Sequence, residues 1–267
     1  MRLALGLEYD GSPFCGWQSQ PSGCGIQDVL EKALQIMAGH ALRVTAAGRT
    51  DTGVHALIQV VHFDTDTERP ESAWVRGINA MLPKSVRVLW AKQLDSEFHA
   101  RFSAFARRYQ YLLINSPVSP AILNNKAGWF HLPLNITAMQ QASQLLLGTH
   151  DFSAFRASEC QAKSPIKQMQ RAEVRAQGNC IMFEFEANAF LHHQVRNMIG
   201  ALVYIGKGKY PPEHMAGLLQ GRDRTQAPPT FSAAGLYLSG VSYEEKWELP
   251  DTQRKLDFAL SSLRHEM

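Results

Sequence analysis

The sequence has few cysteines and no long apolar run. Four cysteines occur among 267 residues, and no two of them form a C-x-x-C pair. So sparse a set is not the disulfide framework of a small secreted protein. Residues 2–7 lack the apolar stretch of a secretory signal, because Glu8 and Asp10 follow at once. No run approaches the roughly 18 apolar residues of a membrane-spanning helix. We therefore expect a soluble protein of the reducing cytoplasm, with no membrane partner.

The sequence also lacks the motifs by which proteins bind nucleotide cofactors and metal ions. It contains no G-x-G-x-x-G, no G-x-x-x-x-G-K-[ST], no G-x-S-x-G and no H-E-x-x-H. Its ten histidines are scattered. His192 and His193 are adjacent on an expected helix, where successive side chains point about 100° apart and cannot readily share one ion. The sequence thus predicts no metal and no dissociable small-molecule cofactor.

Charge alone says little about partners, because 27 Lys and Arg against 24 Asp and Glu give a formal net charge of only +3. Basic and aromatic residues nevertheless interleave from 98 to 111. On a strand, Arg107 and Tyr109 face one side and Arg108 faces the other. Amphipathic strands often present such arginines to solvent only. Arginines beside aromatic rings on a sheet also neutralise phosphates and stack single-stranded bases. On that second interpretation, Arg101, Arg107 and Arg108 are candidate RNA-binding residues.

Hydrophobic periodicity predicts two successions of strands and helices. Alternating apolar residues predict a strand over 3–9, and apolar residues at helical spacing from Ile26 to Met37 predict a helix that ends before Gly39. The further expected strands cover 57–63, 86–94, 107–114, 168–175, 180–186 and 236–243, and the further helices cover 73–81, 137–146, 191–205 and a shorter segment after 212. The repeated β-α-β-β-α-β order is that of ferredoxin-like domains and of many RNA-binding sheets.

We therefore expect an α+β fold made of two ferredoxin-like, RRM-like halves. Their strands would form one continuous, mainly antiparallel sheet, with helices packed on one side and an active-site cleft between the halves. Residues 1–104 would form the N-terminal half, 105–245 the C-terminal half and 246–267 an appendage. In the appendage, a short amphipathic helix is expected from the apolar residues Leu256, Ala259, Leu260 and Leu263.

The most unusual segment of the chain is the loop from Gly48 to His55. It places Arg, Thr, Asp and His within seven residues, directly before an expected strand. Loops held by a rigid sheet are where catalytic groups concentrate. One interpretation is a turn in which Asp51 bonds only the local backbone. The other makes Asp51 a nucleophile or a base, with Arg49 nearby to keep its carboxylate ionised.

Several blocks of the sequence resemble one family, the TruA family of tRNA pseudouridine synthases. The blocks are Tyr9-Asp10-Gly11 with Gly16-Trp17-Gln18, Gly48-Arg49-Thr50-Asp51-Thr52-Gly53-Val54-His55, Phe98-His99-Ala100-Arg101 with Arg107-Arg108-Tyr109, His150-Asp151-Phe152, Asn188-Ala189-Phe190-Leu191-His192-His193 with Val195-Arg196-Asn197, and Gly235-Leu236-Tyr237-Leu238. The usual signature reads G-R-T-D-A-G-V-H, so Thr52 stands where the family has alanine. The match spans about residues 3 to 243.

The resemblance implies an activity, a substrate and a set of site residues. It implies isomerisation of uridine to pseudouridine at positions 38, 39 and 40 of the tRNA anticodon stem-loop, without cofactor or metal, by a homodimer that shares one tRNA. Asp51 matches the catalytic residue of the family. Arg49 would fill the space of the extruded base or bind phosphate. The Arg, Tyr and Leu that line similar sites match Arg196, Tyr109 and Leu236. Asp51 could attack the sugar, add to the base or remove a sugar proton.

The expected helix around Arg196 gives a specific structural prediction. Its apolar face would place this arginine beside the core, where an unpaired charge is costly, and the family pattern suggests Asp51 as its partner. Two other classes of function are also consistent with parts of the sequence. A non-catalytic RNA-binding module would use the basic and aromatic sheet alone. A metal-dependent nuclease would use Asp51 with Asp64 and His62.

Overall fold

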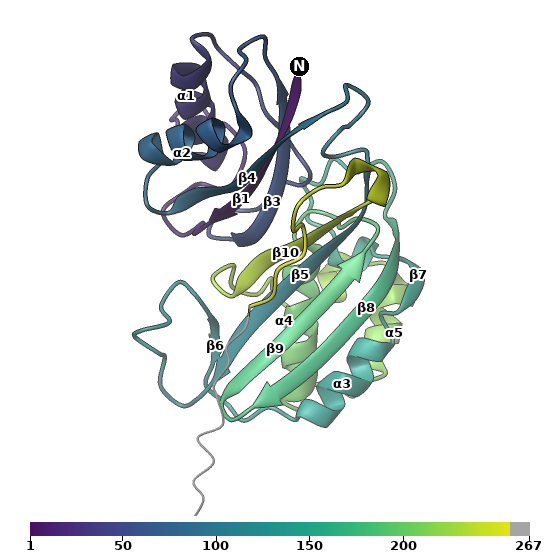
Figure 1. Ribbon diagram of the computed structural model, residues 1–267. Helices are drawn as coiled ribbons and strands as arrows, with labels where there is room; N and C mark the ends of the chain where they lie inside the picture. The colour runs from purple at the N-terminus through teal and green to yellow at the C-terminus, as the bar shows by residue number, and fades with distance from the viewer. Residues whose placement is uncertain (257–267) are drawn as a thin grey trace, which may run out of the picture.

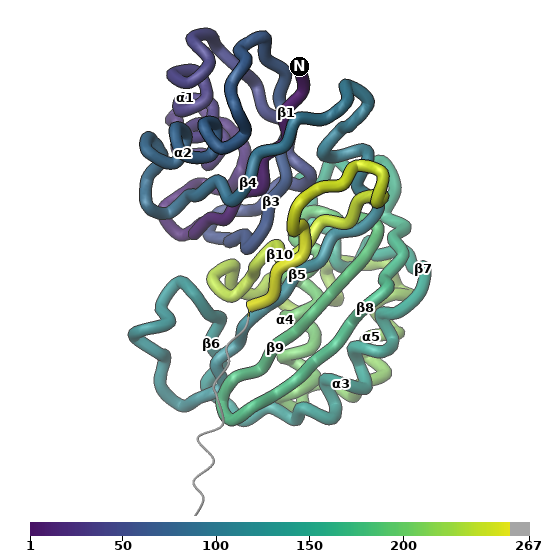
Figure 2. Tube along the Cα trace, viewed as in Figure 1, coloured from purple at the N-terminus to yellow at the C-terminus, as the bar shows by residue number. Residues whose placement is uncertain are grey.

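The computed structural model describes residues 1–256, so most of the amphipathic helix expected in the appendage lies outside the described residues (Figure 1, Figure 2). The strands are β1 (Arg2–Tyr9), β2 (Thr45–Ala46), β3 (His55–Asp64), β4 (Val86–Leu94), β5 (Ala104–Asn115), β6 (Gly128–Phe130), β7 (Gly148–Asp151), β8 (Ile166–Gln177), β9 (Cys180–Ala187) and β10 (Leu236–Tyr243). The α-helices are α1 (Ile26–Ala38), α2 (Glu71–Met81), α3 (Ile136–Gln144), α4 (Gln194–Gly206) and α5 (His214–Gly221).

One sheet runs through both halves of the chain. Its order is β4-β1-β3-β10-β5-β9-β8-β7, with β2 paired to β3 and β6 paired to β5. The last strand, β10, lies in the middle of this order (Figure 1). It runs parallel to β3, with Tyr237 beside His55, and antiparallel to β5, with Leu236 beside Tyr111. The predicted α+β fold with a continuous, mainly antiparallel sheet is therefore confirmed.

The helices cover one face of the sheet, as the alternation of side chains along β5 shows. Tyr111 packs in the same apolar cluster as Met198 of α4. Its neighbour Leu112 points the other way and belongs to a small separate cluster. In the N-terminal half, Trp74 of α2 packs against Phe63 of β3, with ring centroids 5.6 Å apart. Burial of these apolar side chains between helices and sheet supplies the main driving force for folding.

The described residues after β10, up to Leu256, cross the sheet. The backbone N–H of Arg254 donates to the carbonyl oxygen of Ser239 at 2.8 Å. Ser239 follows the two residues of β10, Tyr237 and Leu238, that pair with β3. The indole N–H of Trp90 on β4 donates to the carbonyl oxygen of Asp251 at 3.0 Å. The segment 246–256 thus covers the face opposite the helices, where it joins both halves (Figure 2).

Some local details differ from the prediction. The short strands β2, β6 and β7 have too few residues to show a periodicity, and they form only because longer strands pair with them. The helix expected from residue 191 begins at Gln194, because His193 has a left-handed backbone with φ 61°. The predicted end of α1 is confirmed, since Gly39 caps it with φ 81°. Within residues 1–256, no helix is long and apolar enough to cross a membrane.

Candidate active site

Asp51 lies in the loop between β2 and β3, and this loop rests on the segment before α1. The carbonyl oxygen of Thr50 accepts a hydrogen bond from the backbone N–H of Trp17 at 2.9 Å. The side-chain hydroxyl of Thr50 lies 2.8 Å from the hydroxyl of Tyr9. Burial raises the pKa of Tyr9 to about 12. Gly16 has φ 94°, and a Cβ there would lie 2.8 Å from the Thr50 carbonyl oxygen. Glycine is therefore needed for this close approach.

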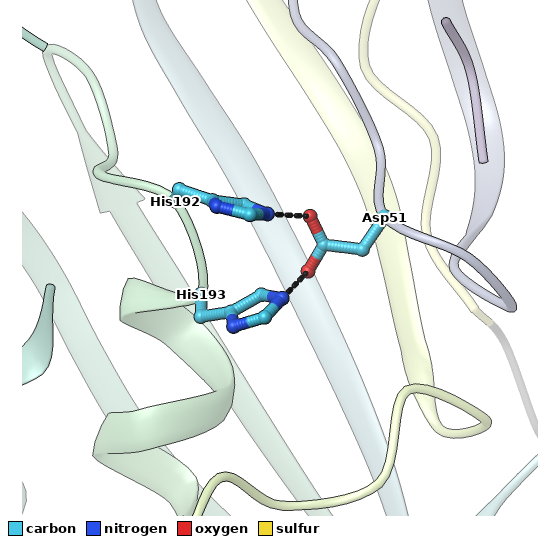
Figure 3. A group of neighbouring side chains, drawn as sticks. All are labelled: Asp51, His192 and His193. Carbon is cyan, nitrogen blue, oxygen red and sulfur yellow. Dashed lines mark ion pairs between the residues drawn. The ribbon is translucent and has the colours of Figure 1, made fainter. Parts of the chain in front are cut away.

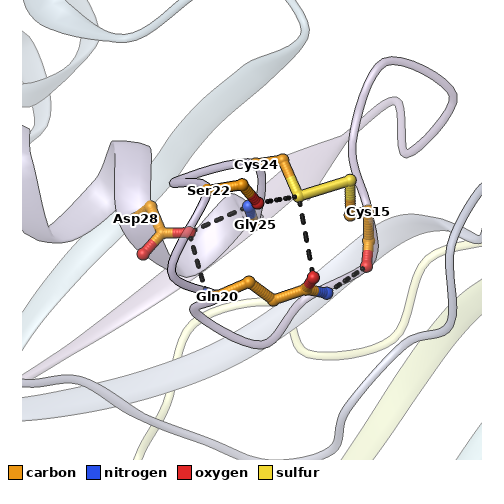
Figure 4. Close-up of a disulfide and its surroundings, with 6 residues drawn as sticks. All are labelled: Cys15, Gln20, Ser22, Cys24, Gly25 and Asp28. Atoms are coloured by element: carbon orange, nitrogen blue, oxygen red, sulfur yellow. Dashed lines mark hydrogen bonds between the residues drawn. A yellow bond between two sulfur atoms is a disulfide. The ribbon is translucent and has the colours of Figure 1, made fainter.

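A disulfide between Cys15 and Cys24 closes the supporting segment (Figure 4). The side-chain amide of Gln20 donates to the carbonyl oxygen of Cys15 at 3.1 Å, and the backbone N–H of Gly25 donates to Asp28 at 2.9 Å. The closed loop thus leads directly into α1. From the sequence we expected a reducing environment, in which disulfides are rare. No C-x-x-C spacing marks this pair, because its cysteines are nine residues apart and meet only in the folded loop.

Arg107 supports the Asp51 loop from the C-terminal half. Its Nη2 donates to the carbonyl oxygen of Ala47, just before the loop, at 3.0 Å. The same guanidinium also donates to the carbonyl oxygens of Arg101, Ala104 and Asn188. Burial lowers the pKa of Arg107. Because both terminal nitrogens of Arg107 donate to backbone, this candidate RNA-binding residue supports the loop in the described structure.

Asp51 itself meets three side chains from the C-terminal half. Nη1 of Arg196 donates to its Oδ2 at 3.1 Å, while Nε of Arg196 donates to the carbonyl oxygen of Phe231 at 2.9 Å. Nε2 of His192 lies 3.3 Å from Oδ1, and Nε2 of His193 lies 3.4 Å from Oδ2 (Figure 3). The side chains of Asp51 and Arg196 are 19% and 17% exposed, so water screens this ion pair only partly. The predicted contact between Asp51 and Arg196 is confirmed.

The two histidines correct our expectation that they point apart. They precede α4 instead of lying on it, and the left-handed conformation of His193 brings both rings to the same side, with centroids 4.1 Å apart. Burial lowers the pKa of His193, and the charge of Asp51 opposes this shift. Helical periodicity could not indicate this arrangement, because it assumes that both residues have helical backbone angles.

Tyr109 and Leu236 lie in neighbouring central strands, on β5 and β10. The ring of Tyr109 meets Phe190 edge to face, with centroids 5.1 Å apart. Burial raises the pKa of Tyr109, and the charge of Asp51 adds to the shift, so the phenol is neutral and within the field of that carboxylate. Leu236 is buried in the apolar cluster against which Tyr109 packs.

The other expected RNA-binding arginines have different surroundings. Arg49 is exposed in the Asp51 loop. Arg101 is also exposed, and its guanidinium lies 5.7 Å from the ring centroid of Phe102. Arg108 instead forms an ion pair with Glu186 at 2.7 Å, on the face of the sheet opposite Tyr109. Arg49 and Arg101 are therefore exposed, whereas Arg108 is engaged within the protein.

Asp51, His192 and His193 are also the one group of potential metal ligands that the described residues bring together. Their ligand atoms lie within 4.8 Å of one another, and zinc accepts such donors. The guanidinium of Arg196, however, already places a fixed positive charge against the same carboxylate. The geometry therefore suits an ion-pair cluster better than a cation site.

The residues of the nuclease hypothesis are engaged elsewhere. Asp64 pairs with Arg2 at 2.7 Å. The Nδ1 atom of His62 accepts a hydrogen bond from the backbone N–H of Ala100 at 3.1 Å. Neither residue belongs to the group around Asp51. The structure does not assemble the metal site that this hypothesis requires within residues 1–256.

A pocket of about 800 Å³ adjoins the cluster, and His192 and His193 form part of its wall. Lys209 and Tyr210 lie on the same wall. A module that only binds RNA gains nothing from a carboxylate at this position, because the carboxylate repels phosphates. The fold and the site therefore indicate an enzyme whose candidate reacting group is the carboxylate of Asp51, held by Arg196.

Comparisons with known proteins agree with this class. The profile of the family described as tRNA pseudouridine synthase matches residues 7–103 and 142–244. The chain is 65% identical to "tRNA pseudouridine synthase A" of Methylobacillus flagellatus, covering 98% of this chain and 100% of the relative. It is 55% identical to the protein of the same name from Thiobacillus denitrificans, covering 97% of this chain and 100% of the relative. The chain belongs to the tRNA pseudouridine synthase family, whose members are isomerases.

Proposed function

We propose that this enzyme converts uridine to pseudouridine at positions 38, 39 and 40 of the tRNA anticodon stem-loop, with Asp51 as its reacting carboxylate. The main support is the ion pair between Asp51 and Arg196, which unites the two halves at one site. The family pattern, in which this aspartate is the catalytic residue, supports the same assignment. Neither a cofactor nor a metal takes part in the proposed reaction.

The chemistry of the isomerisation explains why one carboxylate suffices. The N1–C1′ bond breaks, uracil turns within the closed site, and a C5–C1′ bond forms. The proton on C5 is then lost and N1 gains a proton, so no group or electron pair has to come from a cofactor. Asp51 attacks the sugar, adds to the base or removes a sugar proton. Each of these roles requires an ionised carboxylate that is held in a fixed direction.

The residues around Asp51 have separate proposed roles toward the RNA. The target base lies in a helical stack and must be extruded before it reacts, so exposed Arg49 would enter the vacated space or bind phosphate. Tyr109 would stack on the uracil and assist proton removal. Leu236 would pack on the other face of the base. Exposed Arg101, beside Phe102, would contact the RNA farther from the reacting base.

We further propose that residues 1–104 and 105–245 are two halves of one catalytic unit, and that two copies of the chain bind one tRNA in the cytoplasm. The basis of this proposal is the resemblance to the family, which implies a homodimer that shares one tRNA. Light scattering of the free protein and of its tRNA complex tests this stoichiometry. Two protein chains per tRNA support the proposal, and one chain per tRNA contradicts it.

Tritium release from tRNA labelled at uridine C5 tests the reaction directly. Three transcripts are compared, each with a labelled uridine at only one of the positions 38, 39 and 40. Each should release tritium with the native enzyme, in the presence or absence of EDTA. Asp51→Asn should abolish release while the Kd for tRNA stays within about threefold, because the change preserves shape. Release by Asp51→Asn, or its loss in EDTA, would overturn the proposed mechanism. Binding without release by the native enzyme would indicate an RNA-binding module.

A further inference from the structure

We infer that Oδ1 of Asp51 is the reacting oxygen, and that His193 and His192 are positioning residues for this carboxylate. The inference depends on the proposed function, which assigns the chemistry to Asp51. Oδ2 accepts a hydrogen bond from Arg196 and also faces His193. Among the described residues, Oδ1 has only the contact with His192 at 3.3 Å. The less engaged oxygen is the one that can approach a substrate atom.

The backbone of His193 gives an independent reason to assign it a role. Its φ of 61° is a left-handed conformation that costs a non-glycine residue free energy. Such outliers persist where the surroundings enforce them, and they cluster at functional sites. The ring of His193 is 29% exposed beside an open pocket, so close packing does not account for the conformation. This conformation instead brings the ring into contact with Asp51 (Figure 3).

The flanking backbone enforces this conformation from both sides. The carbonyl oxygen of His192 accepts a hydrogen bond from the backbone N–H of Ala157 at 3.0 Å. The carbonyl oxygen of His193 accepts one from Asn197 in the first turn of α4, at 2.9 Å. The side chain of Gln194 turns back to accept from the backbone N–H of Leu191 at 2.8 Å. The two rings are thus presented by a fixed turn and not by a mobile loop.

The His193→Gly variant separates a positioning role from a structural one. Glycine relieves the left-handed strain, so the melting temperature should stay the same or rise by about 2 °C, because this is the usual scale of such a change in a chain of this size. The single-turnover rate should nevertheless fall at least about tenfold, with the Kd for tRNA within about threefold. His193→Asn, which tolerates the left-handed region and retains an N–H donor, should recover part of the rate.

The matched control is Arg222→Gly. Arg222 is also left-handed, with φ 55°, and caps α5, but it is not among the side chains that contact Asp51, and its own ion pair with Asp151 leaves the arginine side chain exposed. This variant should gain stability without a change in rate. If His193→Gly behaves like Arg222→Gly, the inference about His193 is wrong while the role of Asp51 stands. If Asp51→Asn is active, the proposed role of Asp51 has failed.

A double-mutant cycle tests the assignment of the two oxygens. His193 and Arg196 act on the same oxygen, so the rate losses of His193→Asn and Arg196→Lys should be strongly non-additive. His192 faces the other oxygen of the same carboxylate, so the coupling of His192→Asn with Arg196→Lys should be weaker than the coupling of His193→Asn with Arg196→Lys. The reverse pattern of coupling would overturn the choice of Oδ1.

Discussion

The guanidinium of Arg196 lies 3.1 Å from Oδ2 of Asp51, although the two residues are 145 positions apart in the sequence. Arg196 also donates to the carbonyl oxygen of Phe231, so its planar group is fixed by two separate acceptors. Such an arginine fixes the orientation of the carboxylate and also stabilises its negative charge. One residue from each half is therefore needed to form the site.

Replacing Arg196 by lysine should cause a large loss of turnover. Lysine retains the charge, but its single ammonium group cannot reproduce the planar arrangement that bonds both Asp51 and Phe231. We expect the single-turnover rate of tritium release to fall about 100-fold, with the Kd for tRNA within about threefold. A normal rate in Arg196→Lys would show that the ion pair does not orient Asp51.

Salt dependence should distinguish Arg101 from Arg108. Exposed Arg101 is free to contact phosphate, so Arg101→Ala should reduce the slope of log affinity against log salt by up to about one unit for every tRNA. Arg108 pairs with Glu186, so Arg108→Ala should leave the slope unchanged. Filter binding between 50 and 200 mM salt, the range over which such slopes are roughly linear, measures both. Equal slopes for the two variants would refute the distinction.

The Cys15–Cys24 disulfide should stabilise the segment under the Asp51 loop. Closing a loop of this length contributes about 2 to 3 kcal/mol in the chain-entropy description. Reduction with dithiothreitol should therefore lower the melting temperature of the native protein by several degrees and slow tritium release. The Cys15→Ser/Cys24→Ser variant should match the reduced protein and show no response to dithiothreitol. A native protein that is insensitive to reduction would contradict this expectation.

His62 should make stability depend on pH. Burial, aided by the charge of Arg2, lowers the pKa of His62 to about 4 from 6.5. The unfolded chain therefore takes up the proton first as the pH falls. Above pH 6.5 the ring is neutral in both states and His62 does not reduce the free energy of unfolding. Between pH 6.5 and pH 4 protonation of the unfolded chain lowers the free energy of unfolding by up to about 3 kcal/mol.

Urea unfolding of the native protein and of His62→Gln, at several values between pH 7 and pH 4, measures this contribution. Glutamine retains an acceptor for the N–H of Ala100 but does not titrate. The free energy of unfolding of the variant should fall less over the same interval. Parallel curves for the two proteins would exclude His62 as the source.

The sequence by itself predicted the longer strands and helices and singled out the loop around Asp51. Periodicity along one strand or helix depends on neighbouring residues only, so β4, β10 and the glycine cap of α1 could be predicted closely. The loop around Asp51 stood out through its own composition. An arginine beside an apolar helix face requires a partner, and the family pattern suggested Asp51 as the partner of Arg196.

Only the tertiary structure decided that His192 and His193 also meet Asp51 and that Arg107 supports its loop. The insertion of β10 between β3 and β5 brings the halves together, and the left-handed backbone of His193 turns two rings toward the carboxylate. Arg107 became a support for the loop because distant carbonyl oxygens converge on it. These contacts join residues far apart in the chain, so they depend on how the strands are ordered, and local periodicity contains no information about that order.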